Sequence, residues 1–212
     1  PLKNLKKDKK IIIIDYFDSD NQMNDILKLD TNYIMQHINP VLYFKRSCID
    51  KTTMKFKKYF SKYNIINYAI KYEYIDNSID FKNKDIDISC FFPLGKRNVD
   101  KNTVNRITLP ILLKEFSIKY PKLKIHIGSV GQTYTFNQNY FDLIKRSKIV
   151  ITCNPPNWIG DFRLFEALAG KTLVLVDKMP TLENILIHKK HLIYYENFYD
   201  IEKNVLHYLN NN

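Results

Sequence analysis

Residues 147–177, SKIVITCNPPNWIGDFRLFEALAGKTLVLVD, decide the fold, because two short apolar runs flank an amphipathic segment. The first run, residues 148–153, is β-branched and too short for a helix, so it predicts a strand. The turn-forming asparagines and prolines at residues 154–157 end that strand. Residues 172–176 are almost entirely apolar, as expected for a strand that helices cover on both faces of a parallel sheet.

A helix is predicted between these two strands. It begins near Gly160 or Asp161 and carries apolar residues at helical spacing. We expect it to end at Gly170, because glycine readily takes the positive φ of a helix C-terminus. Strand, loop, helix and strand in this order are typical of an α/β fold.

Two charged residues, Arg163 and Glu166, are three residues apart and therefore share one side of this helix. A helix N-terminus attracts anions, and the guanidinium of Arg163 would add a fork of donors for phosphate. The carboxylate of Glu166, one turn further on, can accept hydrogen bonds from the paired hydroxyls of a sugar. The alternative is an ion pair on a solvated helix face.

The segment DFRLFEALAG, residues 161–170, resembles the donor-binding signature of GT-B glycosyltransferases, above all their group 1 and CgeB-like branches. The resemblance implies a helix that holds a nucleotide sugar, with Glu166 on the ribose. Many members have a second glutamate eight residues earlier, near the donor sugar, where this chain has Trp158. The ribose contact is therefore implied, whereas the sugar contact is not.

The composition is that of a globular protein, with 212 residues of which 45% are hydrophobic. The net charge of +11 would suit a nucleic-acid-binding protein. The lysines are spread along the chain, however, and the richness in Lys, Asn and Ile is expected of AT-rich coding sequence. We therefore expect no nucleic-acid partner, although a basic nucleic-acid-binding α/β protein stays the third of three interpretations.

Cys48, Cys90 and Cys153 match no metal-binding spacing and indicate reduced, buried thiols in a cytosolic protein. No apolar run approaches the ~20 residues that span a membrane, so we expect no transmembrane segment. The chain begins at Pro1 with neither a methionine nor a signal-peptide core, which suggests a fragment or a processed form. The predicted location is cytoplasmic.

Residues 1–80 predict part of one α/β domain and residues 81–212 a complete second one. In the first part, residues 11–15, 41–44 and 65–70 read as strands. The polar stretch at residues 73–85 is the best linker in the chain.

After the linker, strands and helices alternate in the order of a Rossmann-like, doubly wound parallel sheet. The predicted strands are residues 86–92, 123–127, 148–153, 172–176 and 192–195. The predicted helices are residues 103–119, 137–147, 160–170, 179–188 and 198–209. Pro110 lies inside the first of these helices, which therefore begins late or bends there.

The GT-B donor domain has the same succession of elements, and its loop after the first strand approaches the donor diphosphate. Gly95, Lys96 and Arg97 stand at the matching place, and Arg106 is a further candidate. We also expect Asn157 or Trp158 near the sugar or base. The donor-binding residues predicted in this way are Gly95, Lys96, Arg97, Asn157, Trp158, Gly160, Asp161, Arg163 and Glu166.

Fixed positive groups would stabilise the charge that develops on a departing nucleoside diphosphate, so no metal is required. The resemblance also implies metal independence, and no cofactor besides the nucleotide sugar, which is a substrate. In this family the base that activates the acceptor comes from the other domain, where Asp15, Asp18 and His37 are available. A solvated loop is the alternative for the aspartates, and a structural role is the alternative for His37.

We therefore predict a glycosyltransferase that moves a sugar from a nucleotide sugar to a carbohydrate, protein or lipid acceptor. A non-catalytic or degenerate nucleotide-sugar-binding module is the alternative, favoured by the absent second glutamate and the short N-terminal part. Because a full GT-B enzyme has two similar α/β domains, the resemblance implies a missing N-terminal domain or a partner chain.

Overall fold

The computed structural model of the chain divides into two compact units, residues 1–68 with 156–160 and residues 69–155 with 161–212. The structure describes residues 10–15, 22–24, 29–30, 38–45, 63–65, 70, 75, 78–92, 104–128, 138–154, 162–178 and 186–211. The assignment of residues 1–80 and 81–212 to an acceptor-side and a donor-side domain stays a prediction.

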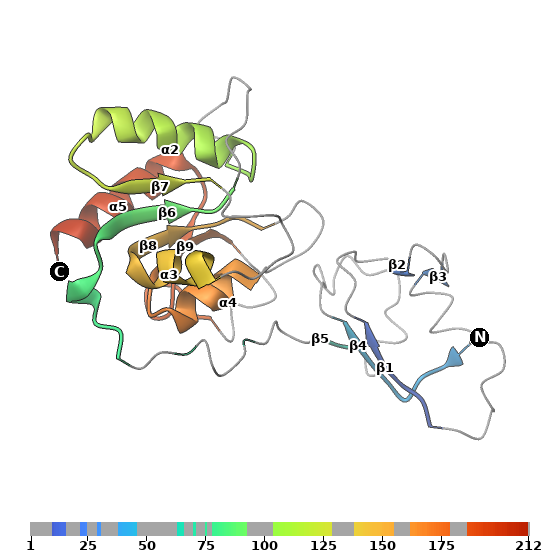
Figure 1. Cartoon of the computed structure of the whole chain (residues 1–212). Helices are drawn as coiled ribbons and strands as arrows, with labels where there is room; N and C mark the ends of the chain where they lie inside the picture. Colours follow the sequence, from blue (N-terminus) through green and yellow to red (C-terminus); the bar gives the residue numbers. More distant parts are fainter. Residues whose placement is uncertain are drawn as a thin grey trace. The chain divides into compact units, whose positions relative to one another are not determined.

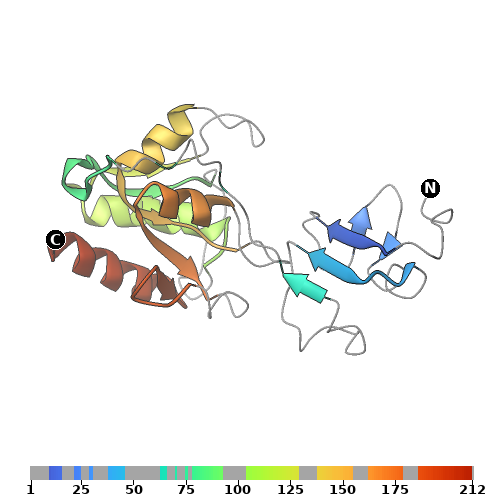
Figure 2. The ribbon, with the colours of Figure 1, turned by 90° about the horizontal axis from the view of Figure 1, so that it is seen from below.

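The first unit contains a three-stranded parallel sheet. Its strands, in spatial order, are β1 (Ile12–Asp15), β4 (Leu42–Lys45) and β5 (Tyr63–Ile65). Figure 2 shows these strands side by side. An antiparallel pair is formed by β2 (Gln22–Asn24) and β3 (Leu29–Asp30). Ile13 and Tyr43 are buried, whereas Ile12 and Ile14 are 57% and 53% exposed, so the apolar run of β1 is buried on one side only.

The second unit is built on a five-stranded parallel sheet (Figure 1). Its strands, in chain order, are β6 (Ile86–Cys90), β7 (Ile125–Ile127), β8 (Ser147–Ile151), β9 (Leu173–Asp177) and β10 (Ile193–Tyr195). The spatial order is β7-β6-β8-β9-β10, and all neighbouring strands are parallel. The predicted doubly wound, Rossmann-like sheet is thus confirmed.

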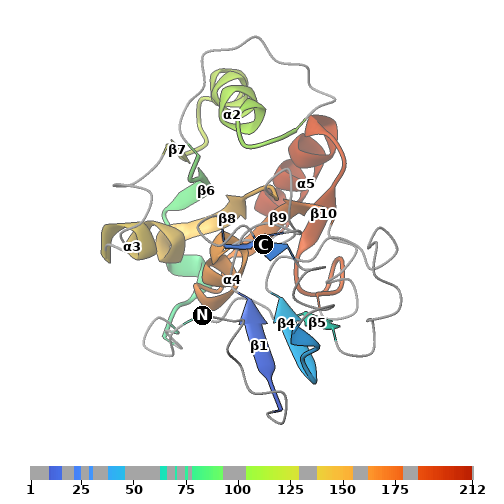
Figure 3. The ribbon, with the colours of Figure 1, turned by 90° about the vertical axis from the view of Figure 1, so that its right-hand side faces the viewer.

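Helices cover both faces of this sheet. They are α2 (Thr108–Lys119), α3 (Gln138–Arg146), α4 (Phe162–Ala169) and α5 (Phe198–Asn210), and a short 3-10 helix, η5 (Phe81–Asn83), precedes β6. Figure 3 shows α2 and α5 on one face and α3 and α4 on the other. The helix predicted at residues 179–188 lies largely outside the described residues. In the described part of the chain, every helix is too short or too polar to cross a membrane.

The hydrophobic core lies between the sheet and the helices α2 and α5. Ile88, Ile149 and Leu175 come from three neighbouring strands and are fully buried there. Leu112 of α2 and Ile201 of α5 pack against them. This burial explains why residues 149–151 of β8 and 173–176 of β9 read as apolar runs in the sequence.

α2 begins five residues later than predicted, directly after a turn that reciprocal hydrogen bonds hold. The side-chain oxygen of Asn105 accepts hydrogen bonds from the backbone N–H of Ile107 at 2.8 Å and of Thr108 at 3.0 Å. In return, the hydroxyl of Thr108 accepts one from the N–H of Asn105 at 2.8 Å. Pro110 therefore lies in the first turn, where its missing N–H leaves no bond unmade. These bonds also fix Arg106 in the turn that leads into α2.

The end of α4 corrects the prediction for Gly170. The N–H of Thr172 bonds to the carbonyl of Ala167, and that of Lys171 to the carbonyl of Leu168, which is the Schellman pattern. Lys171 is the residue with a positive φ, 49°, and Gly170 has none. Glycine is needed at position 170 for space instead, because a Cβ there would lie 2.8 Å from Cγ2 of Ile144.

We expect Lys171→Gly to raise the free energy of unfolding by about 0.5 to 1 kcal/mol, because glycine adopts the positive φ without steric cost. Urea denaturation of both proteins measures the change. Lys171→Ala is the matched control, since it removes the same charge and keeps the Cβ. An equal gain in both variants would show that charge, and not backbone strain, is responsible.

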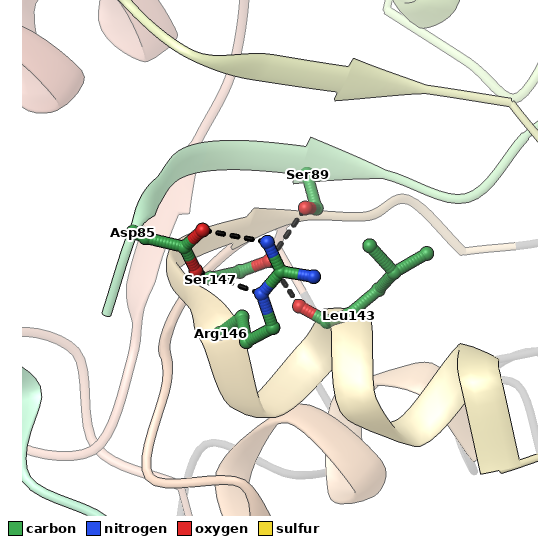
Figure 4. A network of polar contacts seen from close by, with 5 residues as sticks. All are labelled: Asp85, Ser89, Leu143, Arg146 and Ser147. Carbon is green, nitrogen blue, oxygen red and sulfur yellow. Dashed lines mark hydrogen bonds and ion pairs between the residues drawn. The ribbon is translucent and has the colours of Figure 1, made fainter. Parts of the chain in front are cut away.

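A polar network fixes the amino end of the sheet (Figure 4). Arg146, the last residue of α3, forms two hydrogen bonds to the carboxylate of Asp85, at 2.8 and 2.6 Å. The Ser147 hydroxyl donates to the carbonyl of Leu143 and accepts from Ser89, each at 2.5 Å. These bonds determine where α3 ends and β8 begins, and so set the position of α3 on the sheet.

Lys84 joins the C-terminal ends of α3 and α4. Its side chain is buried, and the ammonium donates hydrogen bonds to the carbonyls of Lys145 at 2.7 Å and Gly170 at 3.0 Å. A third bond, at 3.0 Å, goes to the hydroxyl of Thr172. Burial lowers the pKa of Lys84 to about 8. A cation at two helix C-termini satisfies carbonyls that lack partners within the helices.

Candidate functional site

The topology of the second unit marks one place where a ligand would bind. In open parallel sheets, ligands bind beyond the carboxyl ends of the strands, where the strand order reverses. Here the chain runs from β6 outward to β7 and then crosses back to β8. The reversal therefore lies between β6 and β8, next to Phe92 and Cys153, which follow these strands in the sequence.

Two arginines meet at this point on the ring of Phe92. The guanidinium carbon of Arg106 lies 5.2 Å from the ring centroid, and that of Arg163 lies 4.9 Å from it. Phe92 is buried, and Nε of Arg106 also donates a hydrogen bond of 3.2 Å to the carbonyl of Cys153. Arg106 precedes α2 and Arg163 lies in the first turn of α4, so three elements converge on the ring.

This arrangement suits a multiply charged anion. A guanidinium that packs on an aromatic ring keeps its donors in its own plane, directed at the oxygens of an approaching phosphate. Two such groups at fixed positions can bind adjacent phosphates through charge-assisted hydrogen bonds. The N-terminus of α4 adds a partial positive charge beside Arg163.

Glu166 lies one turn beyond Arg163 and is only 3% exposed. The hydroxyl of Tyr140, in the first turn of α3, donates to its Oε2 at 2.5 Å. The ring of Tyr140 packs edge to face on that of Phe91, with the centroids 4.8 Å apart. The burial of Glu166 contradicts the alternative of an ion pair on a solvated helix face.

Side-chain hydrogen bonds tie together the carboxyl ends of β8, β9 and β10. Oδ1 of Asp177 accepts hydrogen bonds from the backbone N–H and the side-chain amide of Asn154, at 2.7 and 2.9 Å. The hydroxyl of Tyr195 donates to the carbonyl of Thr152 at 2.7 Å. The loop that leaves β8 toward α4 therefore starts from a fixed base.

Two of the three cysteines lie near this end of the sheet. Cys90 and Cys153 are buried reduced thiols, which confirms the prediction at these two positions. Burial raises the pKa of the Cys90 thiol to about 12, so it stays protonated at neutral pH. Cys48 lies outside the described residues.

Of the predicted donor-binding residues, the structure describes Arg163 and Glu166, and it brings Arg163 together with Arg106 on the ring of Phe92. Asp15 ends β1, and its side chain is not described. The other predicted site residues lie outside the described residues and stay predictions: Asp18, His37, Gly95, Lys96, Arg97, Asn157, Trp158, Gly160 and Asp161.

Phe92 and Tyr140 are two site residues that the sequence did not predict. Phe92 reads as the last residue of an apolar strand, and Tyr140 as an apolar residue on the buried side of a helix. Their roles depend on contacts with Arg163 and Glu166, which are distant in sequence. The available signal for Phe92 was an aromatic residue at the carboxyl end of β6, the first strand of the second unit.

The family comparison matches the part of the chain that carries Arg163 and Glu166. Residues 108–212, which include all of α4, match a family model described as glycosyl transferase-like. The chain's place in the CgeB-like branch stays a prediction. Comparison of the sequence with curated proteins gives no match.

A solved structure similar to this chain is that of the pneumococcal O-GlcNAc transferase GtfA in complex with UDP and GlcNAc. The identity is 12% and the TM-score 0.46, over 94% of this chain and 44% of that one. The chain therefore spans less than half the length of that transferase.

Proposed function

We propose that this chain is the donor-binding part of a glycosyltransferase that transfers a sugar from a nucleotide sugar to a carbohydrate, protein or lipid acceptor. The observation that carries the proposal is the convergence of Arg106 and Arg163 on Phe92, at the reversal of strand order. The match of residues 108–212 to a glycosyl transferase-like family model supports the proposal.

Each part of the site has a role in this reaction. When the glycosyl bond breaks, negative charge develops on the departing diphosphate, and the two guanidinium groups stabilise it where it forms. Such stabilisation requires no metal ion. The carboxylate of Glu166 accepts hydrogen bonds from the ribose hydroxyls and so orients the nucleotide relative to the arginines.

The remaining parts of the proposal rest on the sequence. Lys96 and Arg97 add positive charge near the diphosphate, and Trp158 stacks on the sugar or the base. The base that activates the acceptor is Asp15, Asp18 or His37.

Calorimetric titration with UDP, GDP and ADP tests the donor site. We expect one of them to bind with micromolar affinity. Glu166→Ala should weaken binding about 10- to 100-fold, or roughly 1.5 to 3 kcal/mol, as for a lost charge-assisted hydrogen bond. Glu115→Ala, on the exposed side of α2, is the matched control and should leave binding unchanged.

Failure of the folded wild-type protein to bind any of the three nucleotides would contradict the donor site. Nucleotide binding without transfer or hydrolysis of a donor sugar would instead favour the non-catalytic module.

A further inference from the structure

We propose that Tyr140 is a positioning residue that orients the carboxylate of Glu166 toward the ribose hydroxyls. This inference rests on the proposed function, in which Glu166 binds the ribose. Tyr140 contacts Glu166 and would act on the nucleotide only through it. Tyr140 would thereby determine how strongly the site distinguishes ribose from a sugar without these hydroxyls.

The hydrogen bond between the two residues is the first support. The Tyr140 hydroxyl donates to Oε2 of Glu166 at 2.5 Å, although the residues are 26 positions apart. Glu166 is 3% exposed, so water contributes little to its solvation. A donor to a buried carboxylate stabilises its charged form and fixes the plane of its two oxygens.

Tyr140 is itself held in place. Its ring packs edge to face on Phe91, which is 2% exposed and follows β6. The neighbouring ring of Phe141 lies 5.7 Å away in a second edge-to-face arrangement. The hydroxyl therefore reaches Glu166 from a ring whose position is fixed by the end of β6 and by α3.

The packing of α3 on α4 gives the second support. Tyr140 contacts Glu166, and four positions further along each segment Ile144 of α3 lies near Gly170, which directly follows α4. Residues four positions apart lie on the same side of a helix, so the two pairs form one line of contact. The small Gly170 lets the helices approach closely, and that approach brings the phenol within hydrogen-bonding distance of the carboxylate.

A fixed carboxylate is what ribose recognition needs. Two neighbouring hydroxyls require both oxygens of the acceptor at defined positions, and a freely rotating side chain presents them only part of the time. Without the tyrosine hydroxyl, Glu166 would remain present and able to bind. The preference of the site for a nucleotide with ribose hydroxyls would fall, whereas binding of the diphosphate by the arginines would not change.

The test compares UDP, GDP and ADP with their 2′,3′-dideoxy analogues, which lack both ribose hydroxyls. For the nucleotide that binds, the wild-type protein should prefer the ribose form by about 10- to 100-fold. Tyr140→Phe should reduce this preference by roughly a factor of 5 to 10 while the dideoxy form binds as before. Glu166→Ala should abolish the preference, and the double variant should behave like Glu166→Ala.

The outcomes separate the two proposals. If the wild-type protein binds none of the nucleotides, the proposed function fails. If Glu166→Ala abolishes the preference and Tyr140→Phe leaves it intact, the donor site stands and the positioning role of Tyr140 is wrong. A purely structural role is indicated if Tyr140→Phe weakens both forms equally. That result also overturns the proposal.

Discussion

Replacement of both Arg106 and Arg163 by methionine is expected to weaken nucleoside diphosphate binding by about 100- to 1000-fold, or roughly 3 to 4 kcal/mol. Methionine keeps much of the side-chain length and apolar packing on Phe92 but donates no hydrogen bond. Each single variant should cost roughly 10- to 30-fold. Because both guanidinium groups pack on the same ring, the two effects need not add.

Titration of each variant with the diphosphate and with the corresponding nucleoside measures this effect. Affinity for the nucleoside should hardly change, because it carries no phosphate for the arginines to bind. Lys114→Met is the control, since it removes one positive charge from an exposed position on α2. A similar loss for the diphosphate and the nucleoside would mean that the arginines support the fold and bind no phosphate.

The order of strands and helices in the second unit could be predicted because each element has a local signal. The buried strands are short apolar runs, and polar turns separate them from helices with apolar residues at helical spacing. The convergence on Phe92 could not be predicted in this way. Arg106 and Arg163 are 57 positions apart, and only the crossing of the chain from β7 to β8 brings them together.

The burial of Lys84 could not be predicted from the sequence, for a different reason. It stands in a polar stretch that reads as a linker, and lysine is rarely buried. The structure nevertheless leaves it only 4% exposed, because three acceptors at the ends of α3 and α4 surround its ammonium. Those acceptors are 61 to 88 positions away in sequence, so no local pattern contains them.

At Gly170 the predicted helix end is correct, but the positive φ given as its reason is wrong. The sequence predicts a helix end there, and α4 does end at Ala169. Glycine at a helix end usually indicates a positive φ, but here the neighbouring Lys171 takes that conformation. The actual requirement is the approach of Ile144, on another helix, which the sequence of α4 cannot reveal.

This contact leads to the second large effect, on stability. Gly170→Ala should lower the free energy of unfolding by about 2 kcal/mol and Gly170→Val by about 4 kcal/mol. The added Cβ would lie 2.8 Å from Cγ2 of Ile144, a fully buried side chain that cannot move aside without disturbing the core. The strain would also act on α3, whose first turn carries Tyr140.

A double-mutant cycle with Ile144→Ala distinguishes this contact from a backbone effect. Ile144→Ala alone leaves a cavity and should cost about 2 to 4 kcal/mol. In combination with Gly170→Ala the clash is gone. The double variant should therefore lose at least about 1 kcal/mol less unfolding free energy than the two single variants lose together. Because Gly170 has no positive φ, alanine would otherwise be favoured there by about 0.5 to 1 kcal/mol. Stabilisation by Gly170→Ala in the wild-type background would therefore contradict the argument, since it would show that α3 can move away from α4 at little cost.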